Sequence, residues 1–135
     1  MSVGLLIISH NNIGESLVNT ANAMIKENPL TTKIISAVLE STSDELYENA
    51  ALLINELDQG DGVLILTDLF GSTPSNIAHR LLEKENVSIV SGINLSMLIR
   101  IFNYPHLNLK EITKKACSGG IDGIKINGVS NGDIV

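Results

Sequence analysis

Two short runs without charged residues constrain the fold more than any other feature of this sequence. The first run is Val3–Ser9 and the second is Val63–Thr67. Runs this short and apolar are typical of strands buried on both faces of a parallel sheet. Stretches with apolar residues at helical spacing lie between the strand-like runs. The sequence therefore predicts a doubly wound α/β fold, with a mostly parallel sheet and helices on both of its faces.

The predicted elements alternate along nearly the whole chain. Strands are predicted at Val3–Ser9, Lys33–Val38, Val63–Thr67 and Val87–Ser91. Helices are predicted at Ile13–Ile25, from the Thr42/Glu45 capping box to Leu57, from Thr73-Pro74 to Leu82, at Leu95–Phe102 and at Leu109–Cys117. Gly119-Gly120 is expected to stop the last helix. Ile121–Ile126 then alternates roughly as a strand and suits a sheet edge.

Size and composition exclude several classes of protein. The 135 residues predict one domain, residues 1–127, and a short tail, residues 128–135. The net charge of −6 and the absence of a basic cluster argue against nucleic-acid binding. There is no apolar run of about 18 residues and no signal-peptide pattern, so no membrane insertion and a cytoplasmic location are expected. The single cysteine, Cys117, excludes an internal disulfide and is expected to be a small packed side chain.

Two side chains that can take part in catalysis follow the two uncharged runs. His10 comes directly after the first run, and Asp68 directly after the second. Carboxyl ends of neighbouring parallel strands lie at the same sheet edge, where α/β folds build their sites. An aspartate that accepts a hydrogen bond from imidazole Nδ1–H leaves Nε2 with its lone pair free. The pair therefore has the parts of an oriented histidine nucleophile.

The segment after Asp68 is suited to an anion. Gly71 and Ser72 form a short loop, and a helix is predicted to begin at Thr73-Pro74, with Thr73 as its N-cap and Pro74 at the first helical position. A helix start offers free backbone N–H groups and the positive end of the helix dipole. The Ser72 and Thr73 hydroxyls are expected to add donors. The loop lacks the lysine and the length of a Walker motif, so nucleotide binding is not implied.

Each feature alone also has an ordinary structural explanation. A histidine at a strand end can be a polar cap, an aspartate can cap a turn, and a Gly-Ser-Thr-Pro segment commonly leads into a helix. Their occurrence at two strand ends favours a shared site. His79 and His106 are interpreted as surface or packing residues. The three histidines have no metal-ligand spacing, so neither a metal nor a cofactor is expected.

Three segments together resemble the EIIA component of the mannose-type bacterial phosphotransferase system. They are Leu6–His10, Gly62–Asn76, which contains the DLFG-x-TP-x-N motif, and Ser91–Leu98. The resemblance runs in register from Val3 to about Ile126. It implies a sheet of four parallel strands, with a C-terminal antiparallel edge strand exchanged across a homodimer. The segment Ile121–Ile126 matches that exchanged strand.

The resemblance also implies a function, that of a phosphotransferase-type component which carries a phosphoryl group transiently on histidine. His10 matches the histidine that accepts the group from phospho-HPr and passes it to an EIIB component. Asp68 matches the aspartate that orients this histidine. The phosphate-binding loop of the family falls on Phe70, Gly71, Ser72 and Thr73.

The sequence departs from the family's usual pattern at four positions, which bear on loop shape and partner choice. These are Asn11 and Ser72, where glycine is common, Ser75, where a bulky residue is common, and Ser96, where proline is common.

Several other functions remain open. The nearest are an EIIA-like phosphocarrier subunit of dihydroxyacetone kinase and a regulatory EIIA in a phosphotransfer chain without a permease. A receiver domain phosphorylated on Asp68 is disfavoured, because it needs acidic Mg²⁺ ligands where this chain has Ser9-His10-Asn11. A histidine phosphatase is disfavoured because Ser9 stands where an arginine would be expected. The last alternative is a non-catalytic binding domain.

Overall fold

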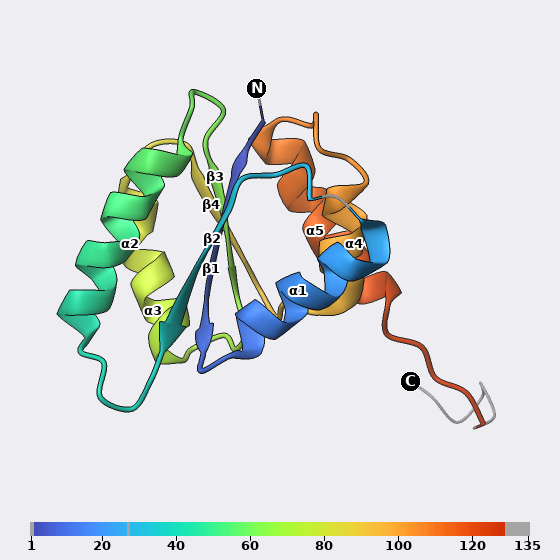
Figure 1. Cartoon of the computed structure of the whole chain (residues 1–135), viewed down its shortest axis with the longest axis horizontal. Helices are drawn as coiled ribbons and strands as arrows, with labels where there is room; N and C mark the ends of the chain where they lie inside the picture. The colour runs from blue at the N-terminus through green and yellow to red at the C-terminus, as the bar shows by residue number, and fades with distance from the viewer. Residues whose placement is uncertain (1, 27, 129–135) are drawn as a thin grey trace.

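A computed structural model describes residues 2–26 and 28–128 of the chain. From β1 to α5, the strands and helices follow one another in the order that the sequence predicts (Figure 1). The strands are β1 (Gly4–His10), β2 (Thr32–Ala37), β3 (Val63–Thr67) and β4 (Val87–Ser91). The helices are α1 (Ile13–Ile25), α2 (Ser43–Leu57), α3 (Thr73–Arg80), the 3-10 turn η1 (Leu81–Glu83), α4 (Leu95–Phe102) and α5 (Leu109–Asp122).

The four strands form one parallel sheet in the order β2-β1-β3-β4. The chain leaves β1 toward β2 on one side and leaves β3 toward β4 on the other. The strand order therefore reverses between β1 and β3. In open α/β sheets, such a reversal opens a crevice at the carboxyl ends of the two strands. Any side chain that ends β1 or follows β3 lies beside this crevice.

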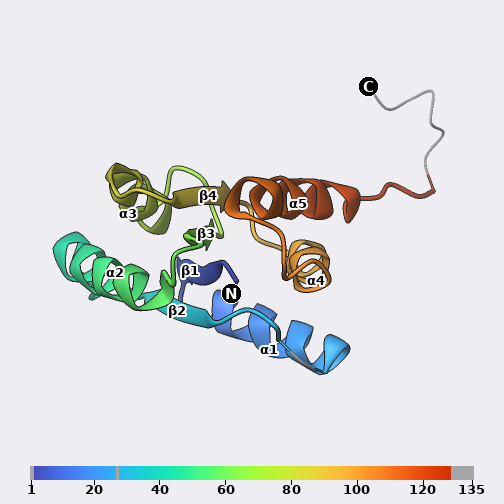
Figure 2. The ribbon, with the colours of Figure 1, turned by 90° about the horizontal axis from the view of Figure 1, so that it is seen from above.

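Helices cover both faces of the sheet (Figure 2). α2 and α3 lie on one face, and α1, α4 and α5 lie on the other. Alternate residues of β1 enter the two cores, because successive strand side chains point to opposite faces. Leu5 and Ile7 pack with the α1/α4/α5 core, while Leu6 and Ile8 pack with the α2/α3 core. The central strands are thereby fixed from both sides.

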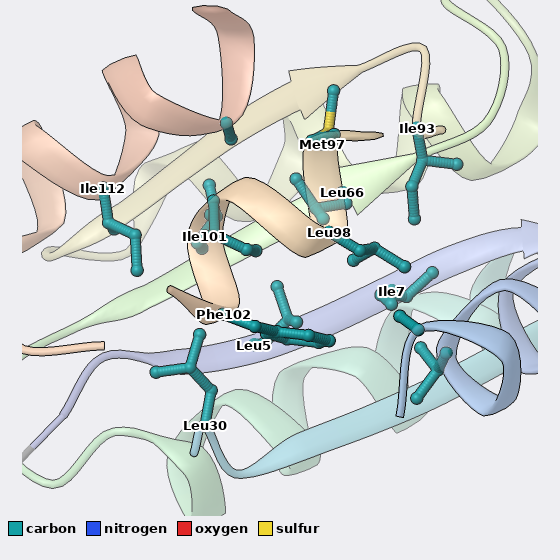
Figure 3. Packing of buried hydrophobic residues seen from close by; sticks show 14 of the residues in the cluster. Leu5, Ile7, Leu30, Leu66, Ile93, Met97, Leu98, Ile101, Phe102 and Ile112 are labelled. Carbon is teal, nitrogen blue, oxygen red and sulfur yellow. The ribbon is translucent and has the colours of Figure 1, made fainter. Parts of the chain in front are cut away.

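The larger core is aliphatic apart from one phenylalanine (Figure 3). Leu98, Ile101 and Phe102 of α4 face the β1 residues Leu5 and Ile7 across this core. Full burial of a side chain of this size stabilises the fold by about 1.5–3 kcal/mol. The ends of β1 and β3, which hold His10 and Asp68, are therefore supported by strands whose apolar residues are fully buried.

The structure differs from the sequence prediction at the last helix. The two glycines expected to stop it, Gly119 and Gly120, lie inside α5, which continues to Asp122. A Cβ on Gly119 would lie 2.4 Å from Cβ of Arg100, so these glycines let α5 approach α4 closely. Glycines that are needed for close helix packing can therefore be mistaken in the sequence for the end of a helix.

The predicted C-terminal edge strand is not present in this chain. Its first two residues, Ile121 and Asp122, are helical, and residues 124–127 have no regular secondary structure. Most of the predicted tail, residues 129–135, lies outside the described residues. Within residues 2–26 and 28–128, no helix has the length and apolar character needed to cross a bilayer.

Candidate functional site

The structure brings His10 and Asp68 together at the crevice between β1 and β3. Asp68 Oδ2 accepts a hydrogen bond from the backbone N–H of His10, at 3.0 Å. The same oxygen lies 2.9 Å from His10 Nδ1. The Asp68 side chain is largely buried, whereas 41% of the His10 side chain is exposed. The pair that the sequence predicted is thus in contact, with the carboxylate shielded and the imidazole open to a partner.

The charge state of Asp68 settles which imidazole nitrogen carries the proton. Burial alone would raise the pKa of the Asp68 carboxyl, but hydrogen bonds from the backbone and ring of His10 outweigh it and lower the pKa below 3.8. Asp68 is therefore a carboxylate near neutral pH and can only accept hydrogen bonds. His10 Nδ1 must then hold the hydrogen, and Nε2 is left with its lone pair when the ring is neutral.

The turn after β1 fixes where His10 lies. Ser9 is fully buried, and its Oγ accepts a hydrogen bond from the backbone N–H of Gly14 in the first turn of α1, at 2.9 Å. Asn11 adopts a left-handed backbone with φ of 47°, and its N–H donates to the carbonyl of Ala37. Asparagine tolerates this conformation better than most residues, which explains how Asn11 serves where the family commonly has glycine.

The end of β3 is fixed in a similar way. The Thr67 hydroxyl donates to Ser91 Oγ at 2.9 Å. The Thr67 carbonyl accepts from the N–H groups of Gly92 and Ile93 in the loop after β4. These bonds tie the residue before Asp68 to the neighbouring strand, so the carboxylate approaches His10 from a rigid support.

The predicted phosphate loop connects Asp68 to α3, and it is well formed. Gly71 has φ of 85°, a conformation that favours glycine, although a Cβ there would meet no atom within 4 Å. Ser72, and not Thr73 as the sequence predicted, is the N-cap residue of α3. The Ser72 hydroxyl donates to the carbonyl of Leu69 at 2.6 Å. Its proton is thus engaged within the loop instead of pointing to an anion.

A groove of about 360 Å³ runs beside the imidazole. It is lined by His10, Asn11, Ala37, Val38, Leu39, Ser41, Leu46 and Thr73. Thr73 is the first residue of α3, so the start of this helix borders the same groove as His10. The backbone N–H groups of a first helical turn have no partner within their own helix and are available to an anion.

Exposed apolar side chains follow the strands on either side of β1, a feature that the sequence analysis missed. Val38 and Leu39 follow β2, and Leu69 and Phe70 follow Asp68; we call these four residues the apolar rim. Leu39 is 96% exposed and Phe70 is 73% exposed. The sequence signal that could have revealed these residues was apolar residues at or just after the ends of predicted strands, outside any helical pattern. Exposed apolar side chains on two loops beside a reactive group favour a protein-docking surface.

The remaining histidines and the cysteine do not line the groove beside His10. His106 is exposed in the loop before α5, and His79 is exposed on α3. The described residues hold no group of three or more His, Cys, Asp or Glu side chains arranged to bind a metal ion. Cys117 is exposed, so its interpretation as a packed side chain was wrong. Cys117 lies on the solvent-facing side of α5. The sequence did not reveal this, because Gly119 interrupts the spacing of apolar residues in this helix.

The fold and the site together define a doubly wound α/β protein with an oriented imidazole at its topological switch point. The same architecture occurs in the mannose/sorbose-specific IIA subunit of the phosphotransferase system from Enterococcus faecalis, with a TM-score of 0.84, 23% identity, and coverage of 97% of this chain and 98% of that one. It also occurs in the PTS IIA protein associated with the fucose utilization operon of Streptococcus pneumoniae, with a TM-score of 0.70, 28% identity, and coverage of 87% and 93%.

Sequence comparison identifies the family. The EIIA-man family, described as "PTS system fructose IIA component", matches residues 4–117, and the chain belongs to this family. The mannose-specific EIIAB component of the Escherichia coli phosphotransferase system is 27% identical over 128 residues, 93% of this chain. The chain spans 39% of the length of that relative. The transcriptional regulatory protein LevR of Bacillus subtilis is 31% identical over 82% of this chain and 12% of its own length.

Proposed function

We propose that the chain is a phosphoryl carrier of the phosphotransferase system, with Nε2 of His10 as the acceptor atom. Phospho-HPr is the donor and an EIIB component is the next acceptor. The observation that carries the proposal is the double hydrogen bond of His10 to Asp68, which directs the lone pair of Nε2 away from the carboxylate. Membership in a family of IIA components supports the same role.

The transfer step is an in-line displacement at phosphorus. The Nε2 lone pair of His10 attacks the phosphorus of the donor phosphohistidine, and the old N–P bond breaks with its electron pair returning to the donor ring. The His10 ring keeps its hydrogen on Nδ1 and becomes positively charged as the new N–P bond forms. The Asp68 carboxylate, 2.9 Å away, stabilises this positive charge. The same positive ring is a good leaving group when the phosphoryl group moves on to EIIB.

The start of α3 supplies the second half of the proposed site. Thr73 borders the groove that holds His10, and the backbone N–H groups of this helix end favour an anion. We assign phosphate binding to Phe70, Gly71, Ser72 and Thr73, through backbone N–H groups more than through hydroxyls. The Ser72 hydroxyl and N–H both donate to the Leu69 carbonyl, so either can contribute only if it gives up that bond.

The apolar rim fits the proposed partners. A carrier that hands a phosphoryl group between proteins must dock two of them at the same histidine. Exposed Leu39 and Phe70 stand on the two loops that flank the crevice and offer apolar contact area on both sides of His10. Partner proteins with a complementary apolar surface around their own phosphorylated residue would be recognised in this way.

A second candidate function is regulatory. The 31% identity with LevR, a transcriptional regulatory protein, favours a role in which phosphorylation of His10 changes a regulatory interaction. The dihydroxyacetone kinase phosphocarrier remains a further alternative. Offering the phosphorylated chain an EIIB component or a dihydroxyacetone kinase separates these functions, because a regulator retains its label in both cases.

The direct test is a phosphotransfer assay with phosphoenolpyruvate, purified enzyme I and HPr. We expect the wild-type chain to acquire an acid-labile phosphoryl group, and His10→Ala to acquire none. His106→Ala is the matched control, because His106 is exposed in the loop between α4 and α5 and does not line the groove beside His10. Labelling of His10→Ala at the wild-type level would end the proposal.

A further inference from the structure

Phe70 is an exposed aromatic ring on a loop, yet it is braced by a second aromatic residue. Its side chain is 73% exposed. The ring of His79 lies edge-to-face with it, with 5.7 Å between ring centroids and 80° between ring planes. This is a favourable geometry for two aromatic rings. An exposed phenylalanine without such a neighbour would sample several rotamers.

The ring of His79 is itself fixed in place. Its Nδ1 lies 2.8 Å from the carbonyl oxygen of Ser75. A carbonyl oxygen only accepts, so Nδ1 carries a hydrogen and donates it. Both residues belong to α3, and Ser75 is 1% exposed. The contact with His79 therefore links Phe70 to the backbone of α3.

The contact between Phe70 and His79 lies next to the proposed site in the sequence. Phe70 lies two residues after Asp68, in the loop that leads from β3 to α3, and His79 lies near the far end of α3 (Figure 1). The loop is thus held at its start by the contact of Asp68 with His10 and at its apolar tip by His79. The family commonly has a bulky residue at position 75, and this chain has a small buried serine there.

We propose that His79 is a positioning residue that holds Phe70 in the orientation required to dock the phosphorylated donor protein. The proposal rests on the proposed carrier function and adds a determinant of partner affinity to it. Its occupant is an apolar surface of that donor protein beside its phosphohistidine, because Phe70 is the most exposed aromatic contact of the apolar rim. Ordering a side chain before binding lowers the entropy lost on association. His79 touches neither the phosphoryl group nor His10, so its effect falls on binding.

The experiment measures KM for phospho-HPr and kcat of phosphotransfer for five chains, at one pH and one salt concentration. They are the wild type, His79→Ala, Phe70→Ala, the double variant and His79→Phe. We expect His79→Ala to raise KM about three- to tenfold with kcat within about twofold of wild type. The double variant should bind no worse than Phe70→Ala, because the brace has no function without the ring that it holds. His79→Phe offers a ring edge again but lacks the bond to the Ser75 carbonyl, so it should recover part of the affinity.

His106→Ala serves as the control for loss of an exposed histidine, and thermal unfolding of each variant shows whether the fold is retained. A wild-type KM for His79→Ala would overturn the inference. So would a double variant whose KM is the product of the two single effects, or a loss in kcat instead of KM. Failure of the wild-type chain itself to accept a phosphoryl group would overturn the proposed function, a result that the wild-type arm reports separately.

Discussion

One carboxylate oxygen of Asp68 holds His10 at two points, the backbone N–H at 3.0 Å and ring Nδ1 at 2.9 Å. The backbone bond fixes the distance between the strand ends, and the ring bond fixes the rotation and the tautomer of the imidazole. Rotating the ring by half a turn would remove its bond to a buried carboxylate. Because losing a hydrogen bond to a charged group costs about 1.5–3 kcal/mol, this one orientation dominates.

The first prediction concerns the atom that carries the phosphoryl group. Because Nδ1 of His10 is engaged with Asp68, the phosphorylated chain should carry the group on Nε2. Nitrogen-15 NMR of the phosphorylated chain, with coupling to phosphorus-31, distinguishes the two nitrogens. Coupling at Nδ1 would contradict the orientation described above.

The second prediction concerns Asp68→Asn. The amide has nearly the same shape, so the fold should remain, and the oriented charge is lost. We expect the rate of phosphotransfer to fall by at least about tenfold, because the amide neither enforces the Nδ1–H tautomer nor stabilises the positive ring. Rapid-quench measurement of labelling from phospho-HPr gives the rate, and circular dichroism checks the fold. Labelling at the wild-type rate would mean that Asp68 does not act on the imidazole.

The third prediction follows from the lowered pKa of Asp68. A carboxyl whose pKa is lower in the folded chain than its ordinary 3.8 stabilises the fold at pH values above 3.8. This stability is lost as the pH falls through the folded pKa. The wild type should therefore unfold at a higher temperature than Asp68→Asn at about pH 5, and the difference should shrink by about pH 3. The measurement is thermal unfolding of both chains across this pH range. A difference in unfolding temperature that grows as the pH falls would contradict the prediction.

The sequence allowed a good part of the site to be predicted because strand ends are visible in it. The uncharged run that ends at His10 and the one that ends before Asp68 are both strands, and their pairing as neighbours brings the two side chains together. The apolar rim was missed, because exposure of Leu39 and Phe70 depends on how two loops leave the sheet. Likewise, the contact between Phe70 and His79 joins residues whose relative rotation no spacing rule specifies.

Gly14 illustrates a residue whose importance only coordinates reveal. A Cβ there would lie 2.8 Å from Cγ2 of Ile7 and 2.8 Å from Oγ of Ser9. Gly14→Ala must therefore push α1 away from the end of β1, and we expect a loss of about 1–3 kcal/mol in the free energy of unfolding. Denaturant titration measures this loss. Glu15→Ala, at the exposed neighbouring position, is the control and should change stability by no more than about 0.5 kcal/mol.

The last prediction concerns a second copy of the chain. β4 is one of the two outer strands of the sheet, and within the described residues it pairs with β3. Beside it, Val90 and Ser91 line a hollow of about 240 Å³ together with Cys117, Ile121 and Ile124. Ile124 and Ile126 are exposed, and the chain carries on past them as far as residue 135. An unpaired strand edge beside exposed isoleucines favours association, since it can accept a further strand.

The family resemblance implies a homodimer with Ile121–Ile126 as the exchanged strand. Because Ile121 and Asp122 are helical, we propose that residues 124–127 of a second copy pair antiparallel with β4. Ile124→Asp together with Ile126→Asp should convert the dimer to a monomer, because each charge would have to enter an apolar contact. Sedimentation velocity measures the change in mass. Leu52→Asp is the control, because Leu52 is 64% exposed on α2, on the opposite face of the sheet from α5 (Figure 2). A wild-type chain that sediments as a monomer, or a double variant that stays dimeric, would show that this edge is not the interface.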